Sequence, residues 1–172
     1  MDLRFTLPSL RKLDLSGTEV LVAGLAADER PPQGVAGLVD WRLAGRISRV
    51  LKSGFVSGAL GEVLLVPGKP KLPFDKVLLF GTGPSADYGE SRFRAVLEKI
   101  LKTLEGLRAR TAVVELPGRH RDALTAERAA DILLEIAGAR PEHDVWTLVE
   151  PAEAQKVITQ HMIQERRRVR QG

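Results

Sequence analysis

The sequence predicts an α/β protein built on a mostly parallel sheet that helices cover. Two observations carry this prediction. Short apolar runs of strand length recur along the chain, and Lys76-Val77-Leu78-Leu79-Phe80 is typical of a strand buried on both faces. Most of the later runs are separated by segments whose apolar residues repeat at about 3.6 positions, the helical period. Such alternation favours parallel strands, while the early strand–loop pairs allow some antiparallel pairing.

The first third of the chain is expected to form two strands and one long helix. Residues 2–7 alternate polar and apolar side chains, as a half-buried strand does, and residues 19–25 are typical of a buried strand. A proline-containing loop at 28–34 follows. Apolar residues at helical spacing then predict an amphipathic helix over 35–52. Ser53-Gly54 ends it, because glycine suits the position just past the last turn.

The centre of the chain predicts two strands that lie together in the middle of one sheet. These are the apolar runs 62–66 and 76–80. The proline-rich linker 67–73 between them allows either a hairpin loop or an edge connection. Gly81-Thr82-Gly83 then forms a turn, and apolar positions from Phe93 to Leu104 predict a helix at 91–105.

The last third predicts strand, helix, strand and helix. Residues 111–116 form a strand, and Thr125 is the expected N-cap of a helix that runs to about Ala137. Residues 144–149 are the last strand, and Pro151 opens a final helix that extends into an arginine-rich tail. No linker is long enough to divide the chain, so residues 1–172 are expected to be one domain, with 160–172 as a basic helical tail.

Composition places the chain among ordinary globular proteins. Hydrophobic residues make up 44% and charged residues 28% of the 172 residues. There is neither an apolar stretch of about 18 residues nor a signal-peptide pattern at the N-terminus, so we expect no membrane segment and a cytoplasmic location. Cysteine is absent, which excludes disulfides and thiolate metal sites.

The formal charge of +4 is concentrated at the C-terminus. Arg166, Arg167, Arg168 and Arg170 carry it, since the other 22 Lys and Arg balance the 22 Asp and Glu. We interpret this tail as a solvated helix end, whose cations suit the helix dipole. Contact with nucleic acid through the same arginines is the alternative, because clustered cations attract phosphates.

The turn at Gly81, Thr82 and Gly83 is the main candidate binding site. Glycines between a strand and a helix let backbone N–H groups approach a phosphate, and the helix dipole adds to the attraction. The pattern is incomplete, because Ala86 stands where the dinucleotide fingerprint has its third glycine and the P-loop lysine is missing. The competing interpretation is a tight turn that requires positive φ.

No catalytic or metal-binding constellation is visible, and we expect no catalytic residue, metal site or cofactor. The histidines lack the i, i+4 spacing of a zinc site, and His161 is expected to be partly buried and structural. No Gly-x-Ser-x-Gly elbow occurs. Asp40 is interpreted as a surface charge, and Trp41 and Trp146 as core residues.

Three central motifs, taken in order, resemble the N-terminal domain of the M17 leucyl aminopeptidases. They are Leu51-Lys52-Ser53-Gly54, then Gly58-x-Leu60-Gly61-Glu62-Val63-Leu64-Leu65-Val66-Pro67, then Lys76-Val77-Leu78-Leu79-Phe80-Gly81-Thr82-Gly83. The resemblance covers roughly residues 19–149. It implies a three-layer α/β/α fold related to macro domains, with a mixed, mainly parallel sheet of five to six strands.

Catalysis in that family belongs to a second, C-terminal domain, where acidic residues and a lysine hold two metal ions beside an Asn-Thr-Asp-Ala-Glu-Gly-Arg motif. Nothing in this sequence resembles that motif, so no catalytic residue is carried over and no peptidase activity is expected of this polypeptide alone. The family's N-terminal domain helps to assemble a hexamer and, in some members, contacts DNA.

These observations give three hypotheses. The first is a non-catalytic module for protein association or regulation, whose partner is a second copy or a separate aminopeptidase catalytic chain. The second, from the likeness to macro domains, is binding of ADP-ribose or a related nucleotide at Gly81 to Gly83, with Asp28 as the acidic residue for the adenine. Pro117-Gly118 is a poor version of the second glycine-rich loop of macro domains. The third is DNA contact through the arginine tail.

Overall fold

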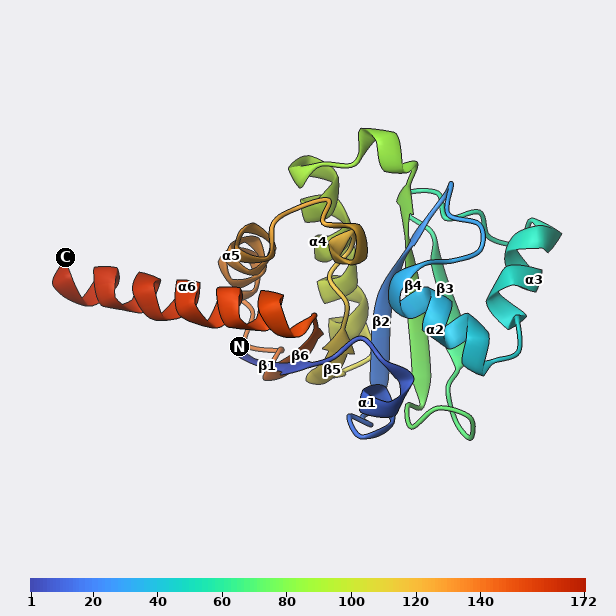
Figure 1. Cartoon of the computed structure of the whole chain (residues 1–172), viewed down its shortest axis with the longest axis horizontal. Helices are drawn as coiled ribbons and strands as arrows, with labels where there is room; N and C mark the ends of the chain where they lie inside the picture. Colours follow the sequence, from blue (N-terminus) through green and yellow to red (C-terminus); the bar gives the residue numbers. More distant parts are fainter.

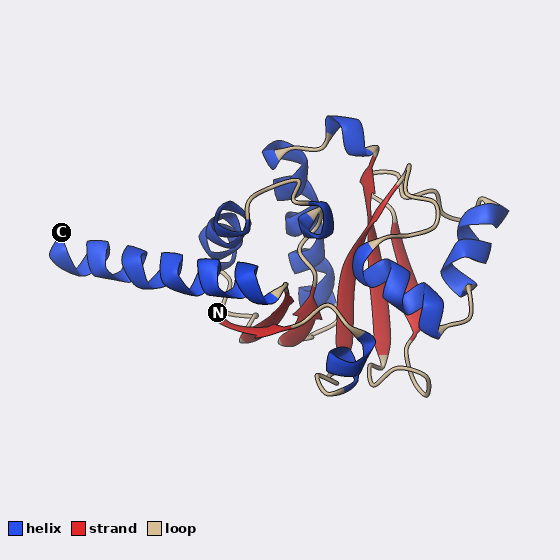
Figure 2. Ribbon diagram, viewed as in Figure 1, coloured by secondary structure: helices blue, strands red, loops and turns tan.

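A six-stranded sheet runs through the computed structural model, which describes all residues from Met1 to Gly172 (Figures 1 and 2). The strand order is β1-β6-β5-β2-β4-β3, and every neighbouring pair is parallel except β3 and β4. The predicted α/β class with a mixed, mainly parallel sheet is confirmed. The strands are β1 (Asp2–Thr6), β2 (Val20–Ala26), β3 (Val63–Pro67), β4 (Lys76–Gly83), β5 (Thr111–Val114) and β6 (Val145–Val149).

Helices cover both faces of this sheet (Figure 2). One face is packed by α1, α2 and α3, and the other by α4 and α5. The helices are α1 (Leu10–Asp14), α2 (Gly34–Arg42), α3 (Arg46–Ser53), α4 (Glu90–Gly106), α5 (Ala126–Ala137) and α6 (Ala152–Gln171). Single 3-10 turns lie at Ser85–Asp87 and Arg119–Arg121. No helix combines the length and the apolar character needed to cross a membrane.

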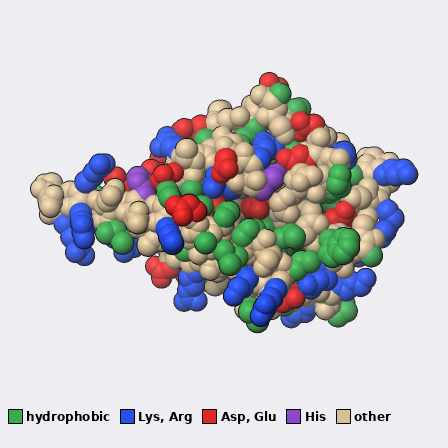
Figure 3. All heavy atoms as spheres, viewed as in Figure 1, with side chains coloured by type: hydrophobic (Ala, Val, Ile, Leu, Met, Phe, Trp, Pro, Cys, Tyr) green, Lys and Arg blue, Asp and Glu red, His purple; other side chains and the backbone are tan.

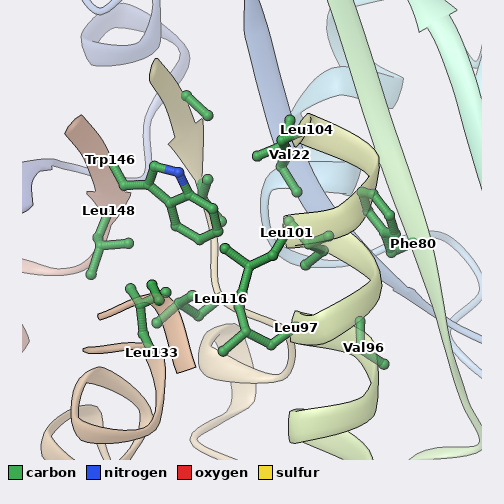
Figure 4. Close-up of a cluster of buried hydrophobic side chains, with 14 of the residues drawn as sticks. Val22, Phe80, Val96, Leu97, Leu101, Leu104, Leu116, Leu133, Trp146 and Leu148 are labelled. Carbon is green, nitrogen blue, oxygen red and sulfur yellow. The ribbon is translucent and has the colours of Figure 1, made fainter. Parts of the chain in front are cut away.

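The core divides by strand parity, because successive side chains of a strand point to opposite faces. In β2, Val20 and Val22 face α4 and α5, whereas Leu21 and Ala23 face α2 and α3. The α4/α5 side is centred on Trp146, whose side chain is fully buried among leucines from α4 and α5 (Figure 4). The continuous apolar runs of the sequence therefore encode strands with apolar side chains on both faces.

The predicted helix over 35–52 is wrong in one respect, since it is two helices. The break lies at Ala44 and Gly45, which have φ of 55° and 83°. The carboxylate of Asp40 accepts hydrogen bonds from the backbone N–H and hydroxyl of Ser48 and so caps the start of α3. Asp40 is buried, which corrects its interpretation as a surface charge.

The predicted position of the two central strands also needs correction. They pair with each other, but antiparallel, with Val63 opposite Phe80 and Pro67 opposite Lys76. The linker 67–73 is thus a hairpin connection, and β3 is the edge strand of the sheet. The short helix α1 was not predicted, because its five residues are too few to show a helical period.

The two tryptophans differ in their exposure to solvent. Trp146 is a core residue as predicted, but Trp41 is 80% exposed, so its interpretation as a core residue is wrong. His161 is half-buried and bonds through Nε2 to the carboxylate of Asp131 on α5 at 2.9 Å, as expected of a structural histidine.

Candidate functional site

The crevice between β2 and β5 is where this topology places a binding site. The two strands are parallel neighbours, but β2 leads to α2 on one face of the sheet and β5 leads to α5 on the other. Ligands of parallel α/β sheets bind at the carboxyl ends of the strands, at such a switch point. The loops that surround it are 27–33 after β2, 84–89 after β4 and 115–125 after β5.

Polar side chains tie these three loops together. The Glu29 carboxylate lies 2.9 Å from His120 Nε2 and 2.9 Å from Arg121 Nη1. The same Arg121 nitrogen donates to Ser85 Oγ at 2.9 Å. The guanidinium also lies over the ring of Tyr88, 5.0 Å from its centre. The crevice is consequently bridged by side chains from its own loops.

The predicted ligand residue Asp28 belongs to this bridge. One of its carboxylate oxygens accepts from the Ser85 backbone N–H at 3.0 Å and from the Ser85 hydroxyl at 2.8 Å. These two hydrogen bonds, the hydroxyl's first, hold the pKa of Asp28 below its usual range. Asp28 therefore joins the loop after β2 to the loop after β4, and its role toward adenine stays a prediction.

Gly81, Thr82 and Gly83 are not a turn but the last three residues of β4, which corrects their predicted local structure. The Gly81 N–H donates to the Glu62 carbonyl at 2.8 Å, and the Gly83 N–H donates to the Gly58 carbonyl at 2.9 Å. Two of the donors expected to cradle a phosphate are thus used by the segment before β3. The next helix, α4, begins only at Glu90.

The glycine at 81 is explained by this close approach. A Cβ at Gly81 would lie 2.0 Å from the Ala59 carbonyl oxygen, so no side chain fits there. Gly83 has φ of 74°, as the interpretation of a structural glycine requires. Phosphate binding at residues 81–83 stays a prediction.

A cavity of about 360 Å³ lies beside the crevice, between the start of α2 and the ends of β5 and β6. Glu115, which directly follows β5, reaches into the start of α2 and accepts a hydrogen bond from the Val35 N–H at 3.1 Å. Burial raises the pKa of Glu115 to about 8 and outweighs that hydrogen bond, which acts to lower it. At neutral pH this carboxyl group is therefore largely protonated.

The arginine of this cavity is already neutralised. Arg119 donates through Nε and Nη2 to the two carboxylate oxygens of Glu150, at 2.8 and 3.0 Å, and both side chains are buried. Asp122 adds a second acid to Arg119 at 2.9 Å. Because carboxyl groups outnumber the cations among its walls, the cavity suits hydrogen-bonding groups better than a bare phosphate.

Sequence reasoning missed Glu115 and Glu150, although a signal was present. Each glutamate directly follows a run of buried strand residues, and both strands are parallel neighbours. Carboxyl ends of parallel strands meet at one edge of the sheet, so two acids at these positions come together. His143, in the loop before β6, is buried and bonds through Nε2 to Glu105, away from this edge.

The arginine tail forms the distal half of α6, which projects from the body as an arm (Figure 1). Its four arginines are all exposed, and only Arg168 makes an ion pair, with Glu165 at 2.9 Å. Figure 3 shows the Lys and Arg side chains standing out along this arm. The arm lies at the opposite end of the molecule from α3.

Structures of known proteins share this fold. The macrodomain of Mycobacterium tuberculosis DarG superimposes with a TM-score of 0.66 at 17% identity, over 87% of this chain and 98% of that one. The Trypanosoma brucei macrodomain in complex with ADP gives 0.68 at 17% identity, over 94% and 69%. A mutant of tomato leucine aminopeptidase gives 0.64 at 14% identity, over 94% of this chain but 35% of that one.

Sequence comparison identifies relatives. The cytosol aminopeptidase of Pseudomonas aeruginosa is 34% identical over 125 residues, which are 70% of this chain and 25% of the relative. A probable cytosol aminopeptidase of Halorhodospira halophila is 31% identical over 121 residues, 69% of this chain and 24% of the relative. The chain thus spans about a quarter of the length of these curated relatives. A family model described as the N-terminal domain of the cytosol aminopeptidase family matches residues 20–139. The chain therefore belongs to the cytosol aminopeptidase family, through that family's N-terminal domain.

Proposed function

We propose that this chain is a protein-association module and that helix α6 is its docking arm. The observation that carries the proposal is the lack of tertiary packing along the distal half of α6. Of the 20 residues of α6, only Ile158 is buried. From Ile163 to Gly172 every residue is exposed except the half-buried Glu165.

A bare helical end of this kind gains stability from a partner. Isolated helices shorter than about 12–15 residues are marginal in water, and most helical stability in proteins comes from packing of an apolar face. The stripe that packs on α5 contains Ile158 and Met162. Residues 165 and 169 continue the same helix face, at spacings of 7 and 11 from Ile158. Val169 on this continuation is 79% exposed.

The chemistry of the arm defines the partner. Arg166 and Arg170 flank the stripe without an acid to pair with, and Arg167, nine positions from Ile158, lies on the opposite face of the helix. Two such arms repel each other, so the complementary surface is an apolar groove with acidic residues at its rim. We propose that a cytosol aminopeptidase catalytic chain supplies this groove, because the curated relatives continue well beyond the part that this chain matches. A second copy of this chain is the alternative occupant.

Sedimentation velocity of the full chain, alone and mixed with an aminopeptidase catalytic chain, tests the proposal. The wild type should form a complex of defined stoichiometry, and Val169→Glu should weaken it. Leu15→Glu is the matched control, because Leu15 is 77% exposed but lies directly after α1, far along the chain from the arm. Formation of the complex by the chain alone would assign the groove to a second copy. A monomer under all conditions, or equal loss in both variants, would contradict the proposal.

Nucleotide binding at the crevice is the second candidate function. It is supported by the likeness to a macrodomain that was solved in complex with ADP, and by the position of the crevice at the carboxyl ends of two parallel strands. The bridge from Glu29 to Arg121 must open to admit such a ligand.

Calorimetric titration with ADP-ribose tests this second function. Asp28→Ala should abolish saturable binding, whereas Asp87→Ala, another exposed acid close to the same loops, should not. Absence of heat with the wild type would remove this candidate and leave the association proposal untouched.

A further inference from the structure

A basic groove lies between α3 and the hairpin connection from β3 to β4. Its volume is about 580 Å³. Four of its ten lining residues are cations, namely Arg46, Arg49, Lys69 and Lys71, and none is acidic. We call this hollow the α3 groove. It lies at the end of the molecule opposite to the α6 arm (Figure 1).

The cations of the α3 groove are poorly compensated. Arg46 and Lys71 make no ion pair with any residue of the chain. Arg49 donates to the Ala44 carbonyl at 2.7 Å, which satisfies one donor but not the charge. Lys69 pairs with Asp75 at 3.0 Å, but both side chains are more than half exposed. Such an exposed pair holds its lysine only weakly.

This positive charge is local. Outside the arginine tail, 22 cations balance 22 acids in the chain. Helix α3 nevertheless carries Arg46, Arg49 and Lys52 with no acid of its own. Figure 3 shows Lys and Arg side chains over α3 and over the nearby β3–β4 connection. A concave surface lined by one sign of charge focuses the field and raises the local concentration of counter-ions.

The walls between these cations are apolar. Leu43 and Val50 come from the helix side, and Pro67 and Pro70 from the hairpin side. Apolar walls lower the local dielectric constant and strengthen the attraction between the cations and an anion that enters. Arginine and lysine together offer several N–H donors, which suits a group with many acceptor oxygens.

We propose that the α3 groove binds a compact polyanion of the oligophosphate class. The cations converge on one hollow from two elements. A nucleic-acid backbone instead needs a track of cations, since its charges are spaced about 3.4 Å apart along each strand. A short phosphate chain carries several charges in the space of one such hollow. The source of the chain, inorganic polyphosphate or a nucleoside polyphosphate, is what the experiment distinguishes.

Calorimetric titration of the full chain with inorganic tripolyphosphate, at low salt and at about 0.15 M, tests the proposal. ATP is titrated in the same way as a second ligand. Arg46→Ala/Lys71→Ala should weaken tripolyphosphate binding roughly tenfold for each cation removed, the effect of losing one charge-assisted hydrogen bond. The control is Lys102→Ala/Lys156→Ala, which removes the same charge from two exposed lysines outside the groove that make no ion pair.

The titrations either support the assignment of the groove or overturn it. Binding that is lost in the groove variant and kept in the control supports the proposal, and tighter binding of ATP than of tripolyphosphate would assign a nucleoside source. Lack of tripolyphosphate binding at low salt would overturn it. Equal loss in the two double variants would also overturn it, because net charge alone would then explain the affinity. Binding of a DNA duplex through the groove without binding of tripolyphosphate would replace the proposal with a nucleic-acid site.

Discussion

Replacing Glu150 by Gln tests how strongly a buried ion pair holds the carboxyl edge of the sheet together. Arg119 in the loop after β5 donates two hydrogen bonds to Glu150, which follows β6, at 2.8 and 3.0 Å. The side chains are 4% and 1% exposed. Glu150→Gln keeps the shape of the acceptor but removes the charge that faces the guanidinium. The folded state is then left with a buried cation.

The magnitude follows from what remains around Arg119. Breaking a buried pair by removal of one partner costs about 3–5 kcal/mol, because the other charge stays buried without compensation. Asp122 still lies 2.9 Å from Arg119, but its side chain is 85% exposed, and the Leu124 carbonyl accepts at 2.7 Å. Because these groups still compensate part of the charge of Arg119, we expect a loss of stability at the lower end of that range, about 3 kcal/mol. For a chain of this length that loss lowers Tm by about 6–12 °C.

Urea unfolding followed by circular dichroism measures this loss. The control is Asp144→Asn, which breaks a similar two-bond pair with Arg110 whose side chains are 55% and 52% exposed. An exposed pair contributes at most about 1 kcal/mol. The double variant Arg119→Met/Glu150→Leu should cost less than Glu150→Gln alone, since it leaves no uncompensated charge. If Glu150→Gln costs no more than Asp144→Asn, the reasoning is refuted.

Three further substitutions have definite expected outcomes. The pKa of Glu115 is raised to about 8 in the folded protein. Between about pH 4.5 and 8 the folded protein therefore keeps a proton that the unfolded chain releases, so the free energy of unfolding should fall as pH rises through this range. Glu115→Gln should flatten that fall in urea unfolding at several pH values; an unchanged slope would contradict it. Gly81→Ala should cost about 1–3 kcal/mol or more through its contact with the Ala59 carbonyl, whereas Gly106→Ala, with open space around it, should be neutral or stabilising in the same assay. Asp40→Ala should cost about 1–2 kcal/mol by uncapping α3, and faster amide exchange confined to α3 should accompany it; uniform exchange would point to another cause.

Most of the elements were predictable because their patterns are local. The six strands and helices α4 and α5 lie within a few residues of their predicted bounds, and Thr125 caps α5 through the Arg128 N–H at 3.2 Å. The missed break between α2 and α3 has a different cause. Apolar residues from 35 to 51 fit one continuous helix, whereas the structure has a break with positive φ at Ala44 and Gly45, after which Asp40 caps the start of α3.

The candidate site was predictable only in part. Asp28 was identified and does lie at the crevice. The glycines at 81–83 were identified as special, but for the wrong local reason, since the segment that crowds Gly81 lies about twenty residues earlier in the chain. The partners Glu29 and Arg121 lie 92 positions apart, so their meeting across the crevice has no local signature.

The sequence by itself determined the class of fold, the succession of the six strands along the chain, the family likeness and the concentration of arginine in the tail. These features depend on periodicity, composition and short motifs, which neighbouring residues carry together. Only the tertiary structure decided the strand order, the place of β3 at the sheet edge, the burial of Glu115 and the Arg119–Glu150 pair. It alone gathered the cations of α3 and the hairpin into one groove within a body of balanced charge. The physical reason is that burial and electrostatic potential depend on distances in space, and residues far apart in the chain set those distances.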